Sequence, residues 1–335
     1  MKKLKAGLIG CGNIANLVHL PHLAKIENVD LTWVCDIVEE KAKEASKKYN
    51  VPKYITDYHE VVEDPEIDFV VITTPPDIHV NMTIDALKNG KHVFLEKPIA
   101  PNLDDAVKLY NFAKGKEDLK VCLGFCLRFH GMFKFVKELL DNVIGEPVIM
   151  WRNAIGTALG VAAPATWVFD KKRSGGMLVE NAVHIFDAFR WFAGEYESVE
   201  GYVKTVTSGI NIEDTVVASM RFKNDCFGSL TQTWTATHSW EAWGVVGKKG
   251  TVTVDGYILG SMRVSWKGEA EREITIKEDP NVMYYKEMVS FVDSIINDKP
   301  VFAGLVDGIR SMEAAIAIQI SGEEKKPVKL PLVTL

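Results

Sequence analysis

LKAGLIGCGNIA occupies residues 4–15 and is followed, after a helical run, by LTWVCD at residues 31–36. A short apolar strand leads into Gly10 and Gly12, where the backbone can turn sharply and approach a ligand closely. Ala15 takes the third small position and lets the next helix pack close to the strand. The first N–H groups of that helix and its positive dipole end favour phosphate. The sequence therefore predicts a dinucleotide-binding loop, whose expected cofactor contacts are Gly10, Cys11, Gly12, Asn13 and Ile14.

A carboxylate ends the second apolar strand. Asp36 follows the glycine turn at the distance, about 20 residues, where an acid accepts hydrogen bonds from the hydroxyls of an adenosine ribose. A 2′-phosphate would be repelled there, and the next four residues, Ile-Val-Glu-Glu, offer no Arg or Ser to offset the repulsion. The sequence therefore predicts NAD as the cofactor and disfavours NADP.

Composition and length exclude several classes of protein. The chain has 335 residues, 47% hydrophobic and 25% charged, which is typical of a globular protein large enough for two domains. A net charge of −6 without a long basic run argues against a nucleic-acid partner. No apolar run approaches the ~20 residues that span a bilayer. The apolar run before Cys11 is also about half of what a lipoprotein signal needs.

Cysteine usage points to a reducing compartment. The five cysteines are odd in number and form no C-x-x-C pair, so we expect reduced thiols in a cytoplasmic protein. Cys122 and Cys126 have no nearby His or Cys pair to complete a metal site. We therefore expect no metal.

The first 120 residues alternate strand and helix. Strands are expected at 5–9, 30–35, 69–73, 91–95 and 119–124, with helices at 13–27, 38–49, 78–89 and 103–115. This alternation predicts a doubly wound parallel sheet of the Rossmann type, and we place its end near residue 122.

The rest of the chain has a different pattern. Alternating runs at 199–208, 215–223, 226–235, 250–254, 262–266 and 272–276 predict a large, mostly antiparallel open sheet. Helices expected at 130–141, 176–193, 281–298 and 304–321 would cover one face, and the last can pack back on the first domain. The prediction is an α/β chain with a Rossmann domain at 1–122 and a substrate and oligomerisation domain at 123–335.

Lys97 lies in GKHVFLEKP, residues 90–98, directly after a predicted strand. Ligands in such folds sit at the carboxyl ends of the strands, where an ammonium can hold a substrate oxygen and stabilise developing charge. The alternative is a surface lysine paired with Glu96. The cofactor fingerprint upstream favours an active-site lysine.

Three ionisable residues interrupt a helix that is otherwise apolar nearly all round. Glu180, His184 and Asp187 fall at i, i+4 and i+7, on one stripe of that helix. Burial of three such groups is unfavourable unless they pair or line a polar cavity. A carboxylate beside an imidazole suits a general base, so we predict His184 as the base and Glu180 as its partner. The alternative is a hydrogen-bonded core histidine.

The motifs together resemble the family of glucose–fructose oxidoreductase, inositol dehydrogenase and MocA (Gfo/Idh/MocA). The resemblance rests on ITTPPDIH (72–79), EKP (96–98), the segment 124–129, the segment from Trp167 to Asp187 and the tail from Lys286 to Pro331. It covers essentially the whole chain. It implies NAD(H)-dependent, reversible hydride transfer between the nicotinamide and a secondary alcohol or ketone of a sugar, sugar derivative or cyclitol. Separately, the flat face of the large predicted sheet leads us to expect a homodimer or homotetramer.

The resemblance assigns further site residues. The implied catalytic residues are Lys97, His184 and Glu180. The implied further cofactor contacts are Thr73, Thr74, Pro75, His79, Glu96 and Lys97. The implied substrate contacts are Lys97, Arg128, Asn153, Glu180 and His184, although a plain strand also explains Asn153. His19 and His22, behind the glycine loop, stay open to cofactor, surface or packing roles.

The chain departs from the family pattern in the site helix. Glu180 stands where the family usually has Asp, Ala182 stands where it has Gly, and Met177 replaces a third glycine. The longer Glu180 implies an altered substrate pose or a direct contact with substrate. Two other functions stay open: an NAD-dependent glycoside hydrolase that oxidises its substrate transiently, and a non-catalytic NAD-binding sensor.

Overall fold

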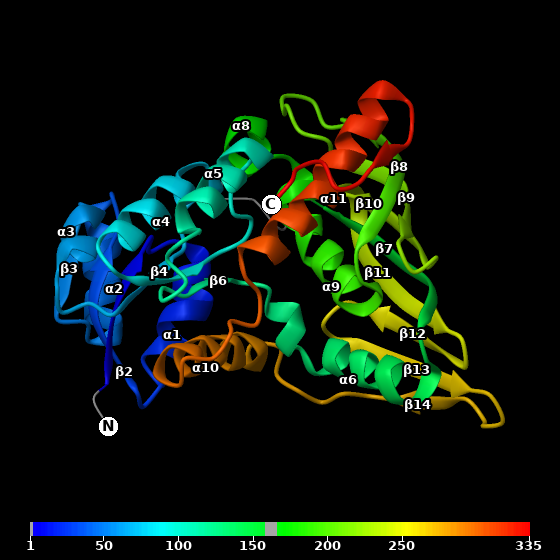
Figure 1. Cartoon of the computed structure of the whole chain (residues 1–335), viewed down its shortest axis with the longest axis horizontal. Coiled ribbons are helices and arrows are strands. Elements are labelled where there is room, and N and C mark those ends of the chain that lie inside the picture. Colours follow the sequence, from blue (N-terminus) through cyan, green and yellow to red (C-terminus); the bar gives the residue numbers. More distant parts are fainter. Residues whose placement is uncertain (1–2, 158–165) are drawn as a thin grey trace. The chain divides into compact units, whose positions relative to one another are not determined.

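The computed structural model describes residues 3–157 and 166–335 (Figure 1). The chain divides into two compact units. The first contains the residues up to Cys126 together with Asn281–Ile309 and Leu335. The second contains Leu127–Pro280 and Arg310–Thr334.

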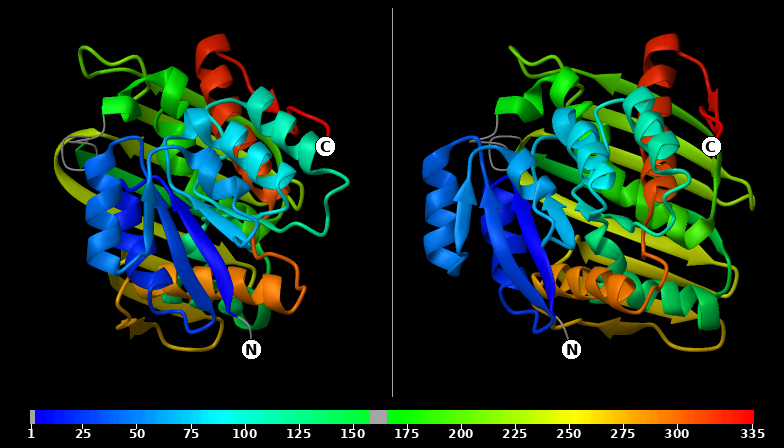
Figure 2. Two further views of the ribbon diagram at one scale, coloured as in Figure 1. Left: turned by 90° about the vertical axis from the view of Figure 1, so that its left-hand side faces the viewer. Right: turned by 60° about the vertical axis from the view of Figure 1, so that its left-hand side comes forward.

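The first unit is built on a six-stranded parallel sheet with strand order β3-β2-β1-β4-β5-β6 (Figure 2). Its strands are β1 (Leu4–Ile9), β2 (Val29–Cys35), β3 (Lys53–Ile55), β4 (Phe69–Ile72), β5 (His92–Leu95) and β6 (Val121–Leu123). All four residues of β4 are buried, as expected for a central strand covered on both faces. The strand order reverses between β1 and β4, and this is where ligands bind in doubly wound sheets.

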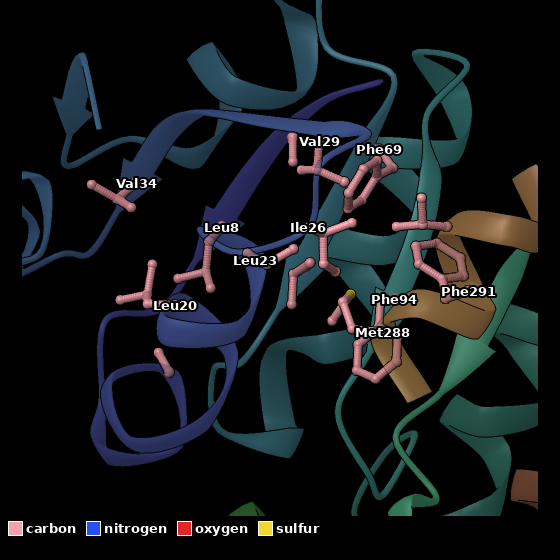
Figure 3. Close-up of a cluster of buried hydrophobic side chains, with 14 of the residues drawn as sticks. Leu8, Leu20, Leu23, Ile26, Val29, Val34, Phe69, Phe94, Met288 and Phe291 are labelled. Atoms are coloured by element: carbon pink, nitrogen blue, oxygen red, sulfur yellow. The ribbon is translucent and has the colours of Figure 1, made fainter. Parts of the chain in front are cut away.

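Helices cover this sheet. They are α1 (Leu20–Leu23), α2 (Glu39–Tyr49), α3 (Tyr58–Glu63), α4 (His79–Lys88), α5 (Leu103–Ala113) and α10 (Val282–Ile296), with the π-helical turn η1 (Ala15–His19) and the 3-10 turn η2 (Pro76–Ile78). Helix α10 belongs to the first unit although it comes after most of the second unit in the chain. Its Met288 and Phe291 are fully buried beside Phe69 and Phe94 (Figure 3).

The second unit contains a nine-stranded sheet, order β14-β13-β12-β11-β7-β10-β9-β8-β15. The strands are β7 (Pro147–Thr157), β8 (Tyr196–Lys204), β9 (Thr215–Phe222), β10 (Phe227–Thr233), β11 (Thr235–Gly247), β12 (Gly250–Gly256), β13 (Gly260–Trp266), β14 (Arg272–Ile274) and β15 (Val328–Lys329). Neighbouring strands are antiparallel except β7 and β10, which pair in parallel.

Side chains of this sheet alternate between a covered and an open face. On β9, Val216, Ala218, Met220 and Phe222 are buried, whereas Val217 is 52% exposed. Such alternation is the pattern of an antiparallel sheet with one solvated face. Helices cover the buried face (Figures 1 and 2).

The helical elements of the second unit are α6 (Gly131–Leu139), α8 (Lys171–Ser174), α9 (Val183–Ala193) and most of α11 (Leu305–Glu324). The 3-10 turns η3 (Cys126–Phe129) and η5 (Thr166–Phe169) and the π-helical turns η4 (Leu140–Ile144) and η6 (Leu178–Ala182) complete them. Turn η6 leads directly into α9, so the two form one continuous helical segment, which we call the site helix (residues 178–193).

The predicted fold class is confirmed: a parallel Rossmann-type sheet is joined to a mostly antiparallel open sheet. Several elements were not predicted, among them β3, α3 and the strand β11. Strand β3 has only three residues, too few to show periodicity. No helix among the described residues has the length and apolar character needed to cross a lipid bilayer.

Candidate active site

The glycine loop follows β1 and is shaped by two residues that come directly after other strands, Thr73 after β4 and Asp36 after β2. Gly10 has φ +100°, and a Cβ there would lie 3.0 Å from the carbonyl carbon and oxygen of Thr73. The Thr73 hydroxyl donates to the Gly10 carbonyl at 2.6 Å, which fixes this close approach. In contrast, a Cβ added to Gly12 would meet nothing within 4 Å. Glycine is therefore required at position 10 by the chain itself, and at position 12 it leaves room for a ligand.

Asp36 ties the end of β2 to this loop. Its Oδ2 accepts from the Cys11 N–H at 2.8 Å and its Oδ1 from the Val38 N–H at 2.9 Å. Each carboxylate oxygen keeps a further lone pair, so the group can still accept from ribose hydroxyls. The open space over Gly12, the N–H groups at the helix start and Asp36 together fit a dinucleotide.

Asn16 was missed by the sequence reasoning. Its Nδ2 donates to the carbonyls of Cys11 at 2.8 Å and Gly12 at 3.1 Å, so it fastens the loop to the first helical turn. The only signal in the sequence was a polar side chain one turn after the glycines. Asn13 is exposed, while Ile14, Thr74 and Pro75 are partly exposed near the same end of the sheet.

The cysteine of the loop is chemically quiet. Cys11 and Cys35 are buried, and burial raises the pKa of each thiol to about 12. The nearby Asp36 carboxylate raises both pKa values further. Neither thiol is a nucleophile at neutral pH.

Lys97 lies just beyond the carboxyl end of β5 and is the single partly exposed residue in 93–101, where its neighbours are all buried. The preceding Glu96 is only 7% exposed. Its Oε1 contacts His19 Nε2 at 2.6 Å and its Oε2 accepts from the Lys97 N–H at 3.1 Å. Glu96 therefore holds the backbone of Lys97 in place, and His19 is the buried partner of Glu96.

Gly124 makes room for this anchor. A Cβ at this position would lie 3.2–3.4 Å from the Glu96 carboxylate. The pair of Glu96 and His19 joins segments 77 residues apart, which explains why the sequence left His19 open.

His79 has a bracing role. The ring is 1% exposed, and its Nδ1 and Nε2 lie 2.8 Å and 2.7 Å from the carbonyl oxygens of Pro98 and Thr74. Burial is the largest effect and lowers the pKa of His79, although both carbonyls oppose it. The ring joins the loop after β4 to the loop that follows Lys97. Its predicted cofactor contact remains a prediction.

A buried acid lies in the same unit, on α10. Glu287 is 0% exposed, and its carboxylate oxygens have no hydrogen-bond partner within residues 3–157 and 166–335. Burial, and then the Glu96 carboxylate, raise the pKa of Glu287 well above its usual value. Burial therefore favours the protonated, neutral form of this acid.

The second unit contains a polar patch on a buried segment. Between residues 174 and 189, three positions are partly exposed, Glu180, Asn181 and His184, and the others are buried. The predicted pair of Glu180 and His184 therefore shares one surface of the site helix. Asn181 joins them, and the sequence reasoning did not select it.

Asp187, expected on the same stripe, is instead fully buried. Arg128 holds it with a two-pronged ion pair, Nε to Oδ2 at 2.9 Å and Nη2 to Oδ1 at 2.6 Å. The π-helical turn η6 adds a residue per turn and shifts the phase of the stripe, so Asp187 falls behind the patch. Arg128 thus neutralises a buried carboxylate; its predicted substrate contact stays a prediction.

The start of the site helix is also fastened from elsewhere in the chain. Glu213 accepts from the Leu178 N–H at 2.9 Å and from Gln319 Nε2 at 2.9 Å. Gly176, at φ +99°, permits this, because a Cβ there would lie 2.5 Å from the Glu213 carboxylate. Burial raises the pKa of Glu213.

Asn153 lies away from this patch. On β7 the side chains of Met150, Arg152 and Ala154 are buried, so Asn153 alternates onto the opposite face of the sheet. Arg152 instead reaches the site helix through Gln232, which bonds Asn181. The structure thus groups Glu180 and His184, and leaves Asn153 on the open face, where its predicted role is not tested.

Comparisons with known proteins identify the family of the chain. Residues 4–125 match a model described as the oxidoreductase family, NAD-binding Rossmann fold, and residues 137–330 match the C-terminal alpha/beta domain of the same oxidoreductase family. Among curated relatives, myo-inositol 2-dehydrogenase of Thermotoga maritima is 28% identical over 341 residues, 98% of each chain. The scyllo-inositol 2-dehydrogenase (NAD(+)) of Bacillus subtilis is 25% identical and covers 98% of this chain and 96% of that one.

A solved structure, levoglucosan dehydrogenase in complex with NADH, superposes with a TM-score of 0.91 at 20% identity, covering 99% of this chain and 100% of that one. This likeness shows a shared fold. The two family models together match most of the chain, so the prediction of an NAD-binding Rossmann domain is confirmed. The chain belongs to the Gfo/Idh/MocA family of oxidoreductases.

Proposed function

We propose that this protein is an NAD(H)-dependent dehydrogenase that oxidises a secondary alcohol of a sugar, sugar derivative or cyclitol to a ketone, reversibly. The observation that carries the proposal is Lys97, the one partly exposed side chain in a buried run at the carboxyl end of β5. The names of the inositol and levoglucosan dehydrogenases that this chain resembles support the substrate class.

Each site residue has a part in this reaction. Lys97 donates a hydrogen bond to the reacting oxygen and stabilises its negative charge as the proton leaves. His184 takes the hydroxyl proton, and Glu180, one turn earlier on the same patch, orients the imidazole. The glycine loop, Asp36 and the Thr73 tie hold the cofactor, which supplies the hydride acceptor when bound.

The test is NADH formation at 340 nm with NAD and then NADP, across inositols, aldoses, anhydrosugars and sugar acids. The Lys97→Met variant keeps the length of the side chain and removes its charge. We expect it to lose about 10³-fold in kcat while still binding NADH. Lys43→Met, on the exposed face of α2, is the matched control and should keep wild-type rates.

Silence of the wild-type protein across the panel despite NADH binding would refute the dehydrogenase. Turnover of a chromogenic glycoside without accumulated NADH would then identify the hydrolase, and no turnover of either would leave a sensor. Equal rates for Lys97→Met and wild type would refute the role of Lys97 but not the proposed reaction.

We also propose a second copy of the chain as a partner on the open face of the nine-stranded sheet. Tyr202 and Val217, 73% and 52% exposed, lie directly opposite each other on β8 and β9. Phe227 and Ile149, 54% and 41% exposed, do the same on β10 and β7. Apolar pairs of this kind on a solvent-exposed face of a sheet favour association. Light scattering should report a dimer or tetramer, and a monomer at micromolar concentration would contradict this.

A further inference from the structure

Asn181 is one of the three partly exposed residues between 174 and 189, together with Glu180 and His184. Its position alone says little, because a surface asparagine needs no function. What distinguishes it is a chain of buried hydrogen bonds that ends on its side-chain oxygen.

The chain begins at Arg152 on β7, which is 4% exposed. Its Nη1 donates to Gln232 Oε1 at 3.0 Å. A guanidinium has only donors, so Gln232 has to present its oxygen to Arg152 and its amide nitrogen to the other side. That nitrogen, Nε2, donates to Asn181 Oδ1 at 2.9 Å.

Arg152 is itself held on two further sides. Its Nη2 donates to Glu241 Oε2 on β11 at 3.1 Å. Its guanidinium carbon lies 4.6 Å from the centre of the Tyr257 ring, a cation–π contact. Gln232 is 2% exposed, so neither member of the pair can turn toward solvent instead.

These hydrogen bonds fix which atom of the Asn181 side-chain amide faces Gln232. Asn181 accepts on its oxygen, so its Nδ2 points to the other side as a donor. Within residues 3–157 and 166–335, that oxygen's bond to Gln232 is the only hydrogen bond that the Asn181 side chain makes. Two N–H donors therefore lie on the polar patch next to the proposed general base.

We propose that Asn181 binds substrate by donating hydrogen bonds to an oxygen of a polyhydroxylated ligand, and that Arg152 and Gln232 are positioning residues that set its amide as a donor. The inference rests on the dehydrogenase function proposed above. It adds a residue that donates a hydrogen bond to a substrate oxygen other than the one that loses its proton.

The first test is Asn181→Leu, which keeps the size of the side chain and removes both polar atoms. With the best substrate of the panel, KM should rise about 10-fold, the effect of one lost hydrogen bond of this kind, while kcat stays within a factor of about three. Asn142→Leu, on an exposed turn of the same unit, is the matched control and should leave both constants unchanged.

The second test reverses the direction of the hydrogen bond between residue 232 and Asn181 without changing a residue of the polar patch. Gln232→Glu keeps an oxygen for Arg152 and removes the Nε2 donor. Asn181 then has to turn its own amide nitrogen toward the glutamate and present its oxygen to the substrate. KM should rise as in Asn181→Leu, and the double variant should show no further rise, because both changes remove the same contact. A merely structural role would lower the unfolding temperature of Gln232→Glu without this non-additivity.

A third readout does not depend on turnover. The side-chain amide signal of Asn181, identified by its loss in Asn181→Leu, should shift in the NMR spectrum of the NADH-loaded protein when myo-inositol or levoglucosan is added, whichever binds. Unchanged KM in a folded, active Asn181→Leu protein would overturn the inference and leave the dehydrogenase standing. A wild-type protein that neither turns over nor binds any member of the panel would overturn both.

Discussion

The cofactor loop of the first unit and the site helix of the second are held in place by different means. In the loop, the groups that are held are backbone groups: Gly10 has a positive φ, the Thr73 hydroxyl bonds the Gly10 carbonyl, and the Asn16 side-chain amide, one turn away, bonds the Cys11 and Gly12 carbonyls. The site helix is fastened by side chains that come from distant segments of the chain, namely Glu213, Arg128 and the pair of Arg152 and Gln232.

The difference has a chemical reason. A pyrophosphate is bound by N–H groups, which every residue has, so a loop can bind it with little help from side chains. A substrate with several hydroxyls needs side chains at fixed angles, and a buried helix that carries polar groups has to have each one satisfied. Changes in the loop should therefore act on cofactor binding, and changes around the helix should act on stability and substrate together.

The largest expected effect is the loss of Arg128. Arg128→Met removes the two-pronged ion pair of the Asp187 carboxylate, which is 0% exposed, and this should destabilise the second unit by about 3–5 kcal/mol. Chemical unfolding followed by tryptophan fluorescence measures it. The matched control is Arg221→Met, whose ion pairs are about half exposed and should contribute about 0–1 kcal/mol. Equal losses for the two variants would contradict the distinction between the two regions.

Two glycines of the loop should separate structure from binding. Gly10→Ala forces a Cβ against Thr73 in a strained conformation, which should destabilise the first unit by about 1–3 kcal/mol and abolish tight NADH binding. Gly12→Ala meets no protein atom and should unfold like wild type, yet weaken NADH by about 100-fold, because the methyl group takes up ligand space. Fluorescence titration and thermal unfolding give both quantities. A fully stable Gly10→Ala protein would refute the stated role of Thr73.

The Asp36→Asn variant tests the hydrogen bond by which the end of β2 holds the glycine loop. The amide cannot accept as strongly from the Cys11 N–H and the ribose, so NADH affinity should fall about 10-fold while the affinity for NADPH rises relative to it. The ratio of the two dissociation constants is the measurement. An unchanged ratio would show that Asp36 supports the loop and does not select the cofactor.

The smallest expected effect concerns Glu287, the buried acid on α10 in the first unit. Its pKa is raised in the folded protein, so the folded state keeps a proton that the unfolded state loses above about pH 4.5, and stability falls as pH rises from there. Glu287→Gln removes this dependence. It should be more stable than wild type by about 1 kcal/mol at neutral pH, with a difference that grows between pH 5 and 8.

Thermal unfolding of both proteins across that range tests the sign. Glu27→Gln, at an exposed site, is the control and should show no trend. A difference that shrinks with rising pH would mean that Glu287 is ionised in the folded protein.

The same contrast explains how far the sequence could be read. The glycine turn, Asp36 and the strand-end Lys97 are local patterns with a fixed spacing, and the structure places them at one end of the parallel sheet, as predicted. Glu180 and His184 were predicted because ionisable residues stand out in an otherwise apolar helix.

Other features have no local pattern. The contact of His19 with Glu96 spans 77 residues, and the path from Arg152 to Asn181 spans 80 and then 51. The phase of Asp187 depends on a π-helical turn, which hydrophobic periodicity of 3.6 residues does not predict. These contacts arise only when each unit has folded and has brought distant side chains together.

All five cysteines of the chain are buried, and the pKa values of Cys11, Cys35 and Cys226 lie at about 12. At pH 7 only about one such thiol in 10⁵ is in the reactive thiolate form. A maleimide dye or a nitroxide spin label would therefore pass over the native protein. One cysteine introduced at an exposed position, for example Ser239→Cys on β11, would be the single point of attachment, without first removing any natural cysteine.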